Sequence, residues 1–183
     1  MPLVVSPTQD DVLTAVRTLL LSIVPTGTIV LRGPVDRAAQ PIADHILVTP
    51  VHRERLRTNL YLDHAPPPGP DPNGTVDMEQ GTKLELQVDF YGETGGESGP
   101  AAWMDAFTTV WRSEYAVDAL APTCSPLYAD EGRMMPLVTG EEQYLERWMV
   151  RAFLQYNPVT TAPQEYADVL DVTLINVDER YPL

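Results

Sequence analysis

The chain has 183 residues, a formal net charge of −14 and a pI near 4.4. A chain this acidic is unsuited to binding nucleic acid by phosphate neutralisation, and its one cysteine, Cys124, excludes an internal disulfide framework and fits a reducing compartment. The length predicts a single domain over residues 1–183, and the polar residues inside the apolar stretch Val12–Val24 argue against a membrane span or a signal peptide.

The N-terminal part predicts a helix followed by a strand. Ser6 is the expected N-cap, and apolar residues then recur at helical spacing as far as Ile23. Pro25 ends the helix. The β-branched run Thr28–Arg32 predicts a short strand, and residues 33–41 are expected to form a loop.

The next stretch predicts two strands and then a long exposed segment. The strands are His45–Val51 and Arg53–Asp63, joined or bent near Pro50. The segment His64–Gly81 holds five prolines, a turn signal at Asn73-Gly74 and no apolar periodicity. We therefore expect it to be an exposed Pro-rich loop or arm (64–81), and loops of this length commonly carry a function.

The stretch Lys83–Gly92 has the clearest strand pattern of the chain. Four apolar residues alternate there with polar ones: Leu84, Leu86, Val88 and Phe90. This pattern predicts a half-buried central strand. A helix with a wide apolar face is expected from about Pro100, and residues 121–136 are expected to be irregular.

The C-terminal part leaves one element open. Glu142–Tyr156 fits either a helix or a strand, and the turn signal Asn157-Pro158 that follows favours the strand. Tyr166–Val177 predicts a last strand that is apolar on both faces, and Asp178–Leu183 is a short polar tail (178–183). The expected fold is α+β: a single, mostly antiparallel twisted sheet of about six or seven strands, with two helices on one face.

One motif resembles a catalytic element. Residues 96–100 (GESGP) lie between a strand and a helix, where hydrolases place their nucleophile in the order Gly-x-Ser-x-Gly. Here proline replaces the last glycine, and no histidine follows Ser98 to act as its base. Ser98 is therefore read as a helix cap before Pro100, and no catalytic residue is assigned.

The remaining chemistry-bearing residues predict no cofactor and no metal site. His45, His52 and His64 lie close in sequence but lack the spacing of zinc ligands, and Cys124 has no histidine downstream. The sequence shows no phosphate-binding loop, no dinucleotide fingerprint and no internal repeat.

A row of arginines is the best basic patch of the chain. Arg53, Arg55 and Arg57 alternate along an expected strand and could contact phosphate or pair with carboxylates of a neighbouring subunit. Because the chain is so acidic, we favour ion pairing across a subunit boundary. The candidate acidic partners are Glu141, Glu142, Asp168 and Asp171.

Several short motifs, taken in order, resemble the tail-terminator (neck) proteins of long-tailed bacteriophages. They are Arg55-Leu56-Arg57-Thr58-Asn59 with Tyr61, Val88-Asp89-Phe90-Tyr91-Gly92, Gln143-Tyr144 with Arg147, and Asn176-Val177-Asp178. The resemblance spans roughly residues 8–180 and has no catalytic residues to carry over.

The resemblance implies a structural virion protein at the tail or neck, assembled in the host cytoplasm. Such subunits form a homohexameric ring that caps the tail tube, contacts head-completion (connector) proteins and, in contractile tails, the sheath protein. DNA passes through the ring without sequence-specific binding, and no membrane is involved. The sequence leaves the tail type and the orientation of the ring open.

Two other functions are consistent with the residues alone. One is a soluble acidic adaptor or inhibitor that binds a basic partner as a monomer, and the other is a serine hydrolase that uses Ser98. Light scattering separates the ring from the monomeric adaptor, and the missing downstream histidine argues against the hydrolase.

Overall fold

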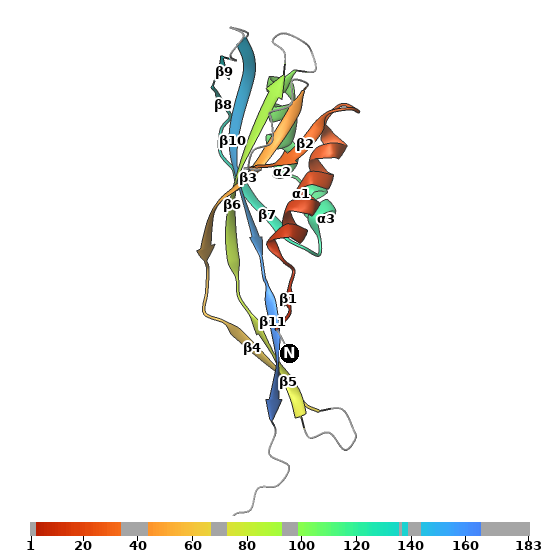
Figure 1. Cartoon of the computed structure of the whole chain (residues 1–183), viewed down its shortest axis with the longest axis vertical. Coiled ribbons are helices and arrows are strands. Elements are labelled where there is room, and N and C mark those ends of the chain that lie inside the picture. Colours follow the sequence, from red (N-terminus) through yellow and green to blue (C-terminus); the bar gives the residue numbers. More distant parts are fainter. Residues whose placement is uncertain are drawn as a thin grey trace, which may run out of the picture.

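The computed structural model describes residues 3–33, 44–66, 73–92, 99–135, 137–138 and 144–165. The molecule is long and thin, with a body at one end and an arm at the other (Figure 1). In the body, a sheet is covered by helices on one face, whereas the arm is a second sheet without helices. The fold is α+β, as predicted.

The described residues form three helices and eleven strands. The helices are α1 (Gln9–Ile23), α2 (Pro100–Trp111) and α3 (Glu114–Leu120). The strands are β1 (Val5–Ser6), β2 (Ile29–Arg32), β3 (His45–Arg55), β4 (Leu60–His64), β5 (Asn73–Glu79), β6 (Thr82–Gly92), β7 (Ser125–Ala129), β8 (Arg133–Met134), β9 (Leu137–Val138), β10 (Tyr144–Tyr156) and β11 (Val159–Glu165).

Helix α1 begins two residues later than predicted. Its N-cap is Thr8, not Ser6, because Thr8 and Asp11 form a reciprocal capping box. The backbone N–H of Asp11 donates to Thr8 Oγ1 at 3.2 Å, and Asp11 Oδ2 accepts from the backbone N–H of Thr8 at 2.7 Å. The helix ends at Ile23, and Gly27 then adopts a φ of 105°, a conformation that favours glycine.

Helix α2 begins at Pro100 as predicted, but its N-cap is Gly99 and no side chain caps it. The predicted capping role of Ser98 is therefore wrong, and Ser98 itself lies outside the described residues. The tryptophan and phenylalanine row of α2 faces the core, whereas Ala102 is exposed. Helix α3 has no counterpart in the sequence-based prediction.

The body sheet has the strand order β2-β3-β6-β10-β7, with β8 and β9 also paired to β10. Strand β6 lies in the middle and pairs antiparallel with β3 and β10, while β2 pairs parallel with β3. Strand β10 confirms the strand interpretation of Glu142–Tyr156. Strands β7 and β8 show that the expected irregularity of residues 121–136 was wrong for much of this stretch.

The core lies between the body sheet and the three helices. Leu84, Leu86, Val88 and Phe90 of β6 are all fully buried, as their alternation predicted. The rings of Phe90 and Phe107 lie 5.8 Å apart, so the central strand packs against α2. Val16 and Leu20 of α1 belong to the same buried cluster.

The arm is a four-stranded sheet with the order β1-β11-β5-β4. Three of its strands continue strands of the body: β4 follows β3, β5 precedes β6, and β11 follows β10 (Figure 1). The β10–β6 pairing of the body leads almost without a break into the β11–β5 pairing of the arm. Tyr156 still pairs with Thr82 in the body, and Val159 already pairs with Glu79 in the arm. Between these pairs, the Gln80 backbone N–H donates to the Pro158 carbonyl at 3.0 Å.

The predicted single sheet with two helices is therefore wrong: the described residues form two sheets and three helices. The sheets are separate because residues 56–59, 80–81 and 157–158 leave the regular pairing at the same level of the molecule. Asn157-Pro158 does not reverse the chain, but lies where β10 leads into β11.

The predicted loop His64–Gly81 is also wrong over much of its length. His64 ends β4, and Asn73–Glu79 is strand β5, with the expected turn residues Asn73 and Gly74 inside it. The apolar periodicity is weak here because the arm has no core against which one face of β5 must pack. Residues 67–72 lie outside the described residues, as do residues 34–41 of the predicted loop 33–41, the predicted strand Tyr166–Val177 and the tail 178–183. The single domain remains a prediction.

Replacing Phe90 by alanine tests the central role of β6. Phe90 is fully buried between the sheet and α2, so Phe90→Ala should lower the free energy of unfolding by about 3–5 kcal/mol. The matched control is Val117→Ala, because Val117 of α3 is 46% exposed and its replacement should change stability by less than about 0.5 kcal/mol. Urea denaturation measures both. Equal losses for the two variants would contradict this core assignment.

Candidate assembly surfaces

One face of the body sheet is covered by no helix of the described residues, and alternate residues of its central strands point to this face. On β6 these are Lys83, Glu85, Gln87, Asp89 and Tyr91, since their neighbours Leu84 to Phe90 face the helices. Cross-strand pairing places alternate residues of β3 and β10 on the same face. We call it the bare face.

A buried ion pair lies at the centre of the bare face. Asp89 is only 1% exposed, and Arg147 of β10 donates to its Oδ1 from Nε at 3.0 Å and from Nη2 at 2.9 Å. Gln87 Nε2 donates to the other carboxylate oxygen at 2.8 Å. Three charge-assisted bonds therefore satisfy the Asp89 carboxylate.

Aromatic rings extend this ion pair toward β3. The Arg147 guanidinium lies 5.4 Å from the centre of the Tyr91 ring, within the range of a cation–π interaction. Tyr91 stacks on His45 with ring centres 4.6 Å apart and nearly parallel planes. Because His45 is 1% exposed, this stack is a structural element and not a solvent-facing histidine.

Two more ion pairs cross the bare face. Arg151 lies 3.5 Å from Glu85, and Lys83 lies 2.5 Å from Glu54. The hydrogen bond between the last two raises the pKa of Lys83 and lowers the pKa of Glu54. Three cations and three anions thus cancel on a chain whose net charge is −14. A charge-balanced face can approach another protein without net repulsion.

The predicted arginine row does not form one face. Arg53 and Arg55 pair with Leu84 and Thr82, which places both on the helix side of the sheet. The Arg53 guanidinium lies 5.6 Å from the ring centre of Tyr156. Arg57 lies past the end of β3 and pairs with Glu79 of β5.

Arg55 and Arg57 stabilise the junction between body and arm. Arg55 donates from Nε to the Arg57 carbonyl at 3.0 Å and from Nη2 to Asn59 Oδ1 at 2.5 Å. These bonds order residues 56–59, where β3 leads into β4. The proposed acidic partners Glu141, Glu142, Asp168 and Asp171 all lie outside the described residues, so their pairing with the arginines stays a prediction.

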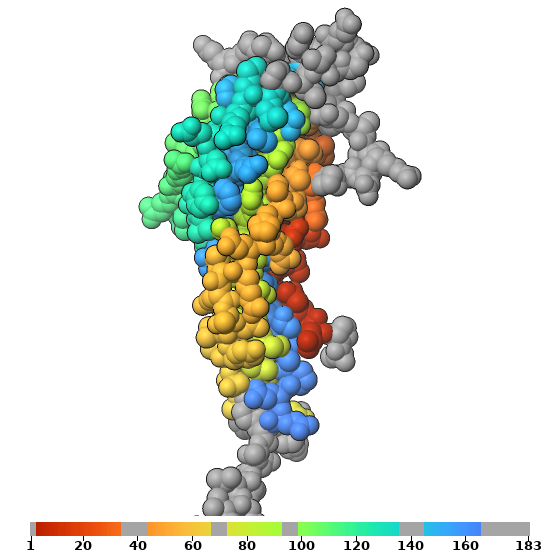
Figure 2. Space-filling view, turned by 90° about the vertical axis from the view of Figure 1, so that its left-hand side faces the viewer, coloured from red at the N-terminus to blue at the C-terminus, as the bar shows by residue number. Residues whose placement is uncertain are grey.

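The outer edge of β3 and β4 is open over most of its length. Strand β2 pairs only with His45–Val48, so from Val51 to His64 no described strand lies beside this edge. Large apolar side chains are exposed along it: Val51 by 53%, Leu56 by 44%, Leu60 by 42%, Tyr61 by 60% and Leu62 by 46%. Figure 2 shows residues 45–64 (orange) as a continuous strip on the molecular surface.

A polar clamp holds the arm strands together. Asp77 of β5 is bound by His64 of β4 at 2.9 Å and by the Thr161 hydroxyl of β11 at 2.5 Å. Both hydrogen bonds lower the pKa of Asp77, and the bond from Thr161 has the larger effect. The clamp fixes the register of three strands in a sheet that lacks a second layer.

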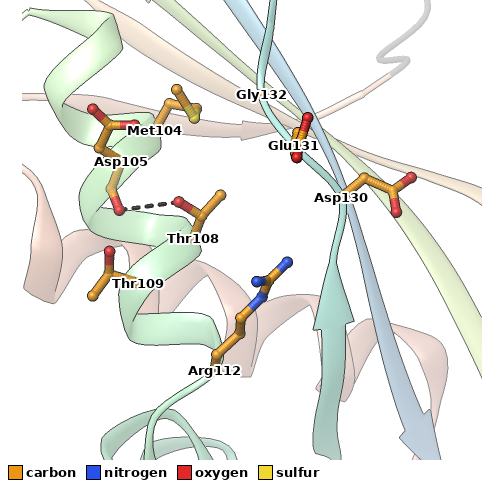
Figure 3. Close-up of a pocket in the computed structure, with 8 residues that line it drawn as sticks. All are labelled: Met104, Asp105, Thr108, Thr109, Arg112, Asp130, Glu131 and Gly132. Carbon is orange, nitrogen blue, oxygen red and sulfur yellow. Dashed lines mark hydrogen bonds between the residues drawn. The ribbon is translucent and has the colours of Figure 1, made fainter.

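The body also contains a polar cleft of about 400 Å³ between α2 and the chain that follows β7 (Figure 3). Arg112 reaches across from the end of α2 and donates to the Ala129 carbonyl. Thr108 donates to the Asp105 carbonyl of its own helix, so its hydroxyl has no base beside it. The lining residues offer no nucleophile, base and orienting group in mutual contact.

No described group of histidine, cysteine and carboxylate side chains is placed to hold a metal ion. His45 and His64 are engaged by Tyr91 and Asp77, respectively. Cys124 is buried, and this burial raises the pKa of its thiol to about 12. Within the described part of the chain, no helix is long and apolar enough to cross a lipid bilayer.

Comparison with known sequences decides the family. The sequence profile of the phage neck terminator proteins matches residues 10–179, which is nearly the whole chain. The chain belongs to the phage neck terminator family. This confirms the resemblance based on the short sequence motifs and identifies the chain as a structural protein of the bacteriophage tail. Among curated proteins, none matches the chain.

The neck terminator fold is also similar to a solved structure. This is the sheath/tube terminator of an extracellular contractile injection system, PVC, in the extended state, at 11% identity and a TM-score of 0.50. The match covers 96% of the neck terminator chain and 65% of the other chain, so the chain spans about two thirds of that protein's length. At this identity the match supports the fold alone.

The sequence-based reading missed the two most informative features of the terminator. The first is the ion pair between Asp89 and Arg147, which lie in separate motifs of the resemblance. A lone aspartate in the middle of an apolar strand was the signal that could have indicated a basic partner on a neighbouring strand. The open edge was missed because the two strands were expected to lie inside one sheet. The alternation of Leu60 and Leu62 with polar residues does not indicate which face or edge is exposed.

Two arginines of β10 provide a matched test of the bare face. Arg147→Met should lower the free energy of unfolding by about 3–5 kcal/mol, because it leaves the buried Asp89 carboxylate without its cation. Arg151→Met should cost less than about 1 kcal/mol, since Arg151 is 53% exposed. Denaturant unfolding at neutral pH measures both. Similar effects would show that the Asp89 site is open to water.

The thiol of Cys124 should be inert in the folded protein. Since only the thiolate is nucleophilic, a pKa of about 12 leaves the thiolate fraction at pH 8 roughly a thousandfold below that of a free cysteine. A disulfide reagent should therefore react with Cys124 only after denaturant is added. Modification in native buffer at the rate of a small thiol would contradict the burial of this side chain.

Proposed function

We propose that this neck terminator chain is the repeating subunit of a closed homohexameric ring. The ring caps the last ring of the tail tube and joins it to the head-completion (connector) proteins, with DNA passing through its channel. The subunit acts in the neck of the virion and assembles in the host cytoplasm. Family membership supports the terminator role, and the ring and its neighbours are the proposal.

The observation that carries this proposal is the uncovered arm. The arm is a single-layer sheet, and its described residues pack against no helix or second sheet. Leu60, Tyr61 and Leu62 of β4 are each more than 40% exposed. A sheet normally buries at least one face against another layer. Partner chains would supply that layer, as expected of an assembly subunit.

A ring requires two different surfaces that match, because head-to-tail contacts are heterologous. Arg53 and Arg55 would supply one surface, since they form no ion pair with a carboxylate of the described residues. Carboxylates at Glu141, Glu142, Asp168 or Asp171 of the neighbouring subunit would supply the other. The bare face carries as many paired cations as anions, so it would suit contact with the tail tube on one side of the ring or with the connector on the other.

The net charge is consistent with a DNA channel. A wall with excess carboxylates repels phosphates, so DNA would pass without binding tightly. The similar solved protein is named a sheath/tube terminator, and on this basis contact with a sheath protein is proposed as well.

Light scattering and negative-stain microscopy of the purified chain, or of tail-bound material, test the ring. The chain should form closed rings, and a double reversal, Arg55→Glu with Arg57→Glu, should give folded subunits that fail to close them. The matched control is Arg32→Glu, since Arg32 is a half-exposed arginine of the body that pairs with Asp10. It should leave the rings intact.

Strictly monomeric protein, both alone and with tail tubes, would overturn the proposal in favour of the acidic adaptor. Circular dichroism of the double variant distinguishes loss of assembly from loss of the fold.

A further inference from the structure

We infer that residues 166–177 of one subunit add as a β-strand to the open β3–β4 edge of a second copy of the chain. The inference deepens the proposed ring and rests on it, because it names the segment and the surface that join neighbouring subunits.

The acceptor is the edge from Val51 to His64. The outward backbone groups of an edge strand are a template for another strand, and natural proteins normally protect such edges with bulges, prolines, charged side chains or a covering element. The charged residues of this edge lie at Arg53–Arg55, Arg57 and Asp63, whereas Leu60–Leu62 carries none. Here the only bulge lies between Pro50 and His52, at the start of the open stretch. Beyond it, the described residues include no proline before Pro66 and no covering element.

Within this edge, Leu60–Leu62 of β4 is a run of large apolar side chains. Leu60 and Leu62 point to one face of the arm and Tyr61 to the other, and all three are exposed. An added strand would pair with the backbone and cover part of these side chains. Leaving them in water favours association with another chain.

The donor has the composition of an interior strand. Residues 166–177 (YADVLDVTLINV) contain no proline or glycine and are rich in β-branched residues. Val169, Ile175 and Val177 alternate with Leu170, Val172 and Leu174, so both faces are apolar. A strand of this kind is stable only between neighbours that cover it.

The donor is also placed to reach a neighbour. It follows β11 directly, and β11 ends at Glu165, which pairs with Asn73 at the distal end of the arm. Twelve extended residues span about 40 Å. This length is comparable with the fourteen residues from Val51 to His64.

Charge favours the same pairing. The donor contains Asp168 and Asp171 and no basic residue. The acceptor edge carries Arg53, Arg55 and Arg57 against Glu54 and Asp63, a local excess of positive charge on a chain of net charge −14. Strand addition would therefore bring the predicted acidic and basic partners of the subunit boundary together.

A second copy fits better than the subunit's own edge. Strand β5 separates β11 from β4, so a segment returning to its own β4 would have to cross the end of the sheet. Addition to a neighbour links each subunit to the next in one direction, which is how a heterologous ring closes.

Cysteine cross-linking tests the inference in the full-length chain. Cys124→Ser removes the only native thiol. Subunits with Leu62→Cys are then mixed with subunits carrying one cysteine at a position from Val169 to Thr173, and assembled before mild oxidation. A disulfide requires Cα atoms about 4.4–6.8 Å apart. Cross-linked dimers should therefore form strongly at one donor position and weakly at its neighbours.

The matched control replaces Leu62→Cys by Val117→Cys, because Val117 is 46% exposed but lies on α3 of the body. This control should give no dimer. A chain carrying both Leu62→Cys and the best donor cysteine should form intermolecular ladders, and an exclusively intramolecular disulfide in it would overturn the inference.

The oligomeric state separates failure of the inference from failure of the proposed function. Rings that form without cross-linking at any donor position would overturn strand addition but leave the ring standing. Cross-linked open chains of subunits would support strand addition and overturn ring closure. Monomers without cross-links, even with tail tubes added, would overturn both.

Discussion

The pairing of β6 with β10 is the interaction on which the rest of the terminator depends. It extends without a break from Glu146 opposite Gly92 to Tyr156 opposite Thr82. One side of this ladder supplies the fully buried residues of the core, and the other supplies the Asp89–Arg147 ion pair. Both strands then lead into the arm. The ladder therefore joins the hydrophobic core, the charged face and the arm.

The two faces of this ladder are stabilised by different physical effects. Hydrophobic burial against α1, α2 and α3 stabilises one face and needs no partner outside the subunit. The bare face instead uses cross-strand ion pairs, whose charges cancel. The described residues of the arm have neither a core nor a covering layer, so strand pairing and the polar contacts between strands stabilise the arm.

The sequence predicted those elements whose patterns are set by a core. The alternation of Leu84 to Phe90 specified β6 and its buried face, and the helical spacing after Thr8 specified α1. Where no core lies nearby, the pattern failed. Strand β5 contains Asn73 and Gly74, and only its partners β4 and β11 hold it extended. The arginine row was found, but its spacing alone did not show that Arg55 and Arg57 bind the junction of their own chain.

The passage of three strands from body to arm has a mechanical consequence. A pull on the tip of the arm would travel along the backbones of β5 and β11 into β6 and β10, in line with the strand axes. Along that direction, the hydrogen bonds of the long ladder are sheared together and not opened one by one. The subunit would thus resist stretching along its long axis, and the force would be carried by the β6–β10 ladder at the centre of its core.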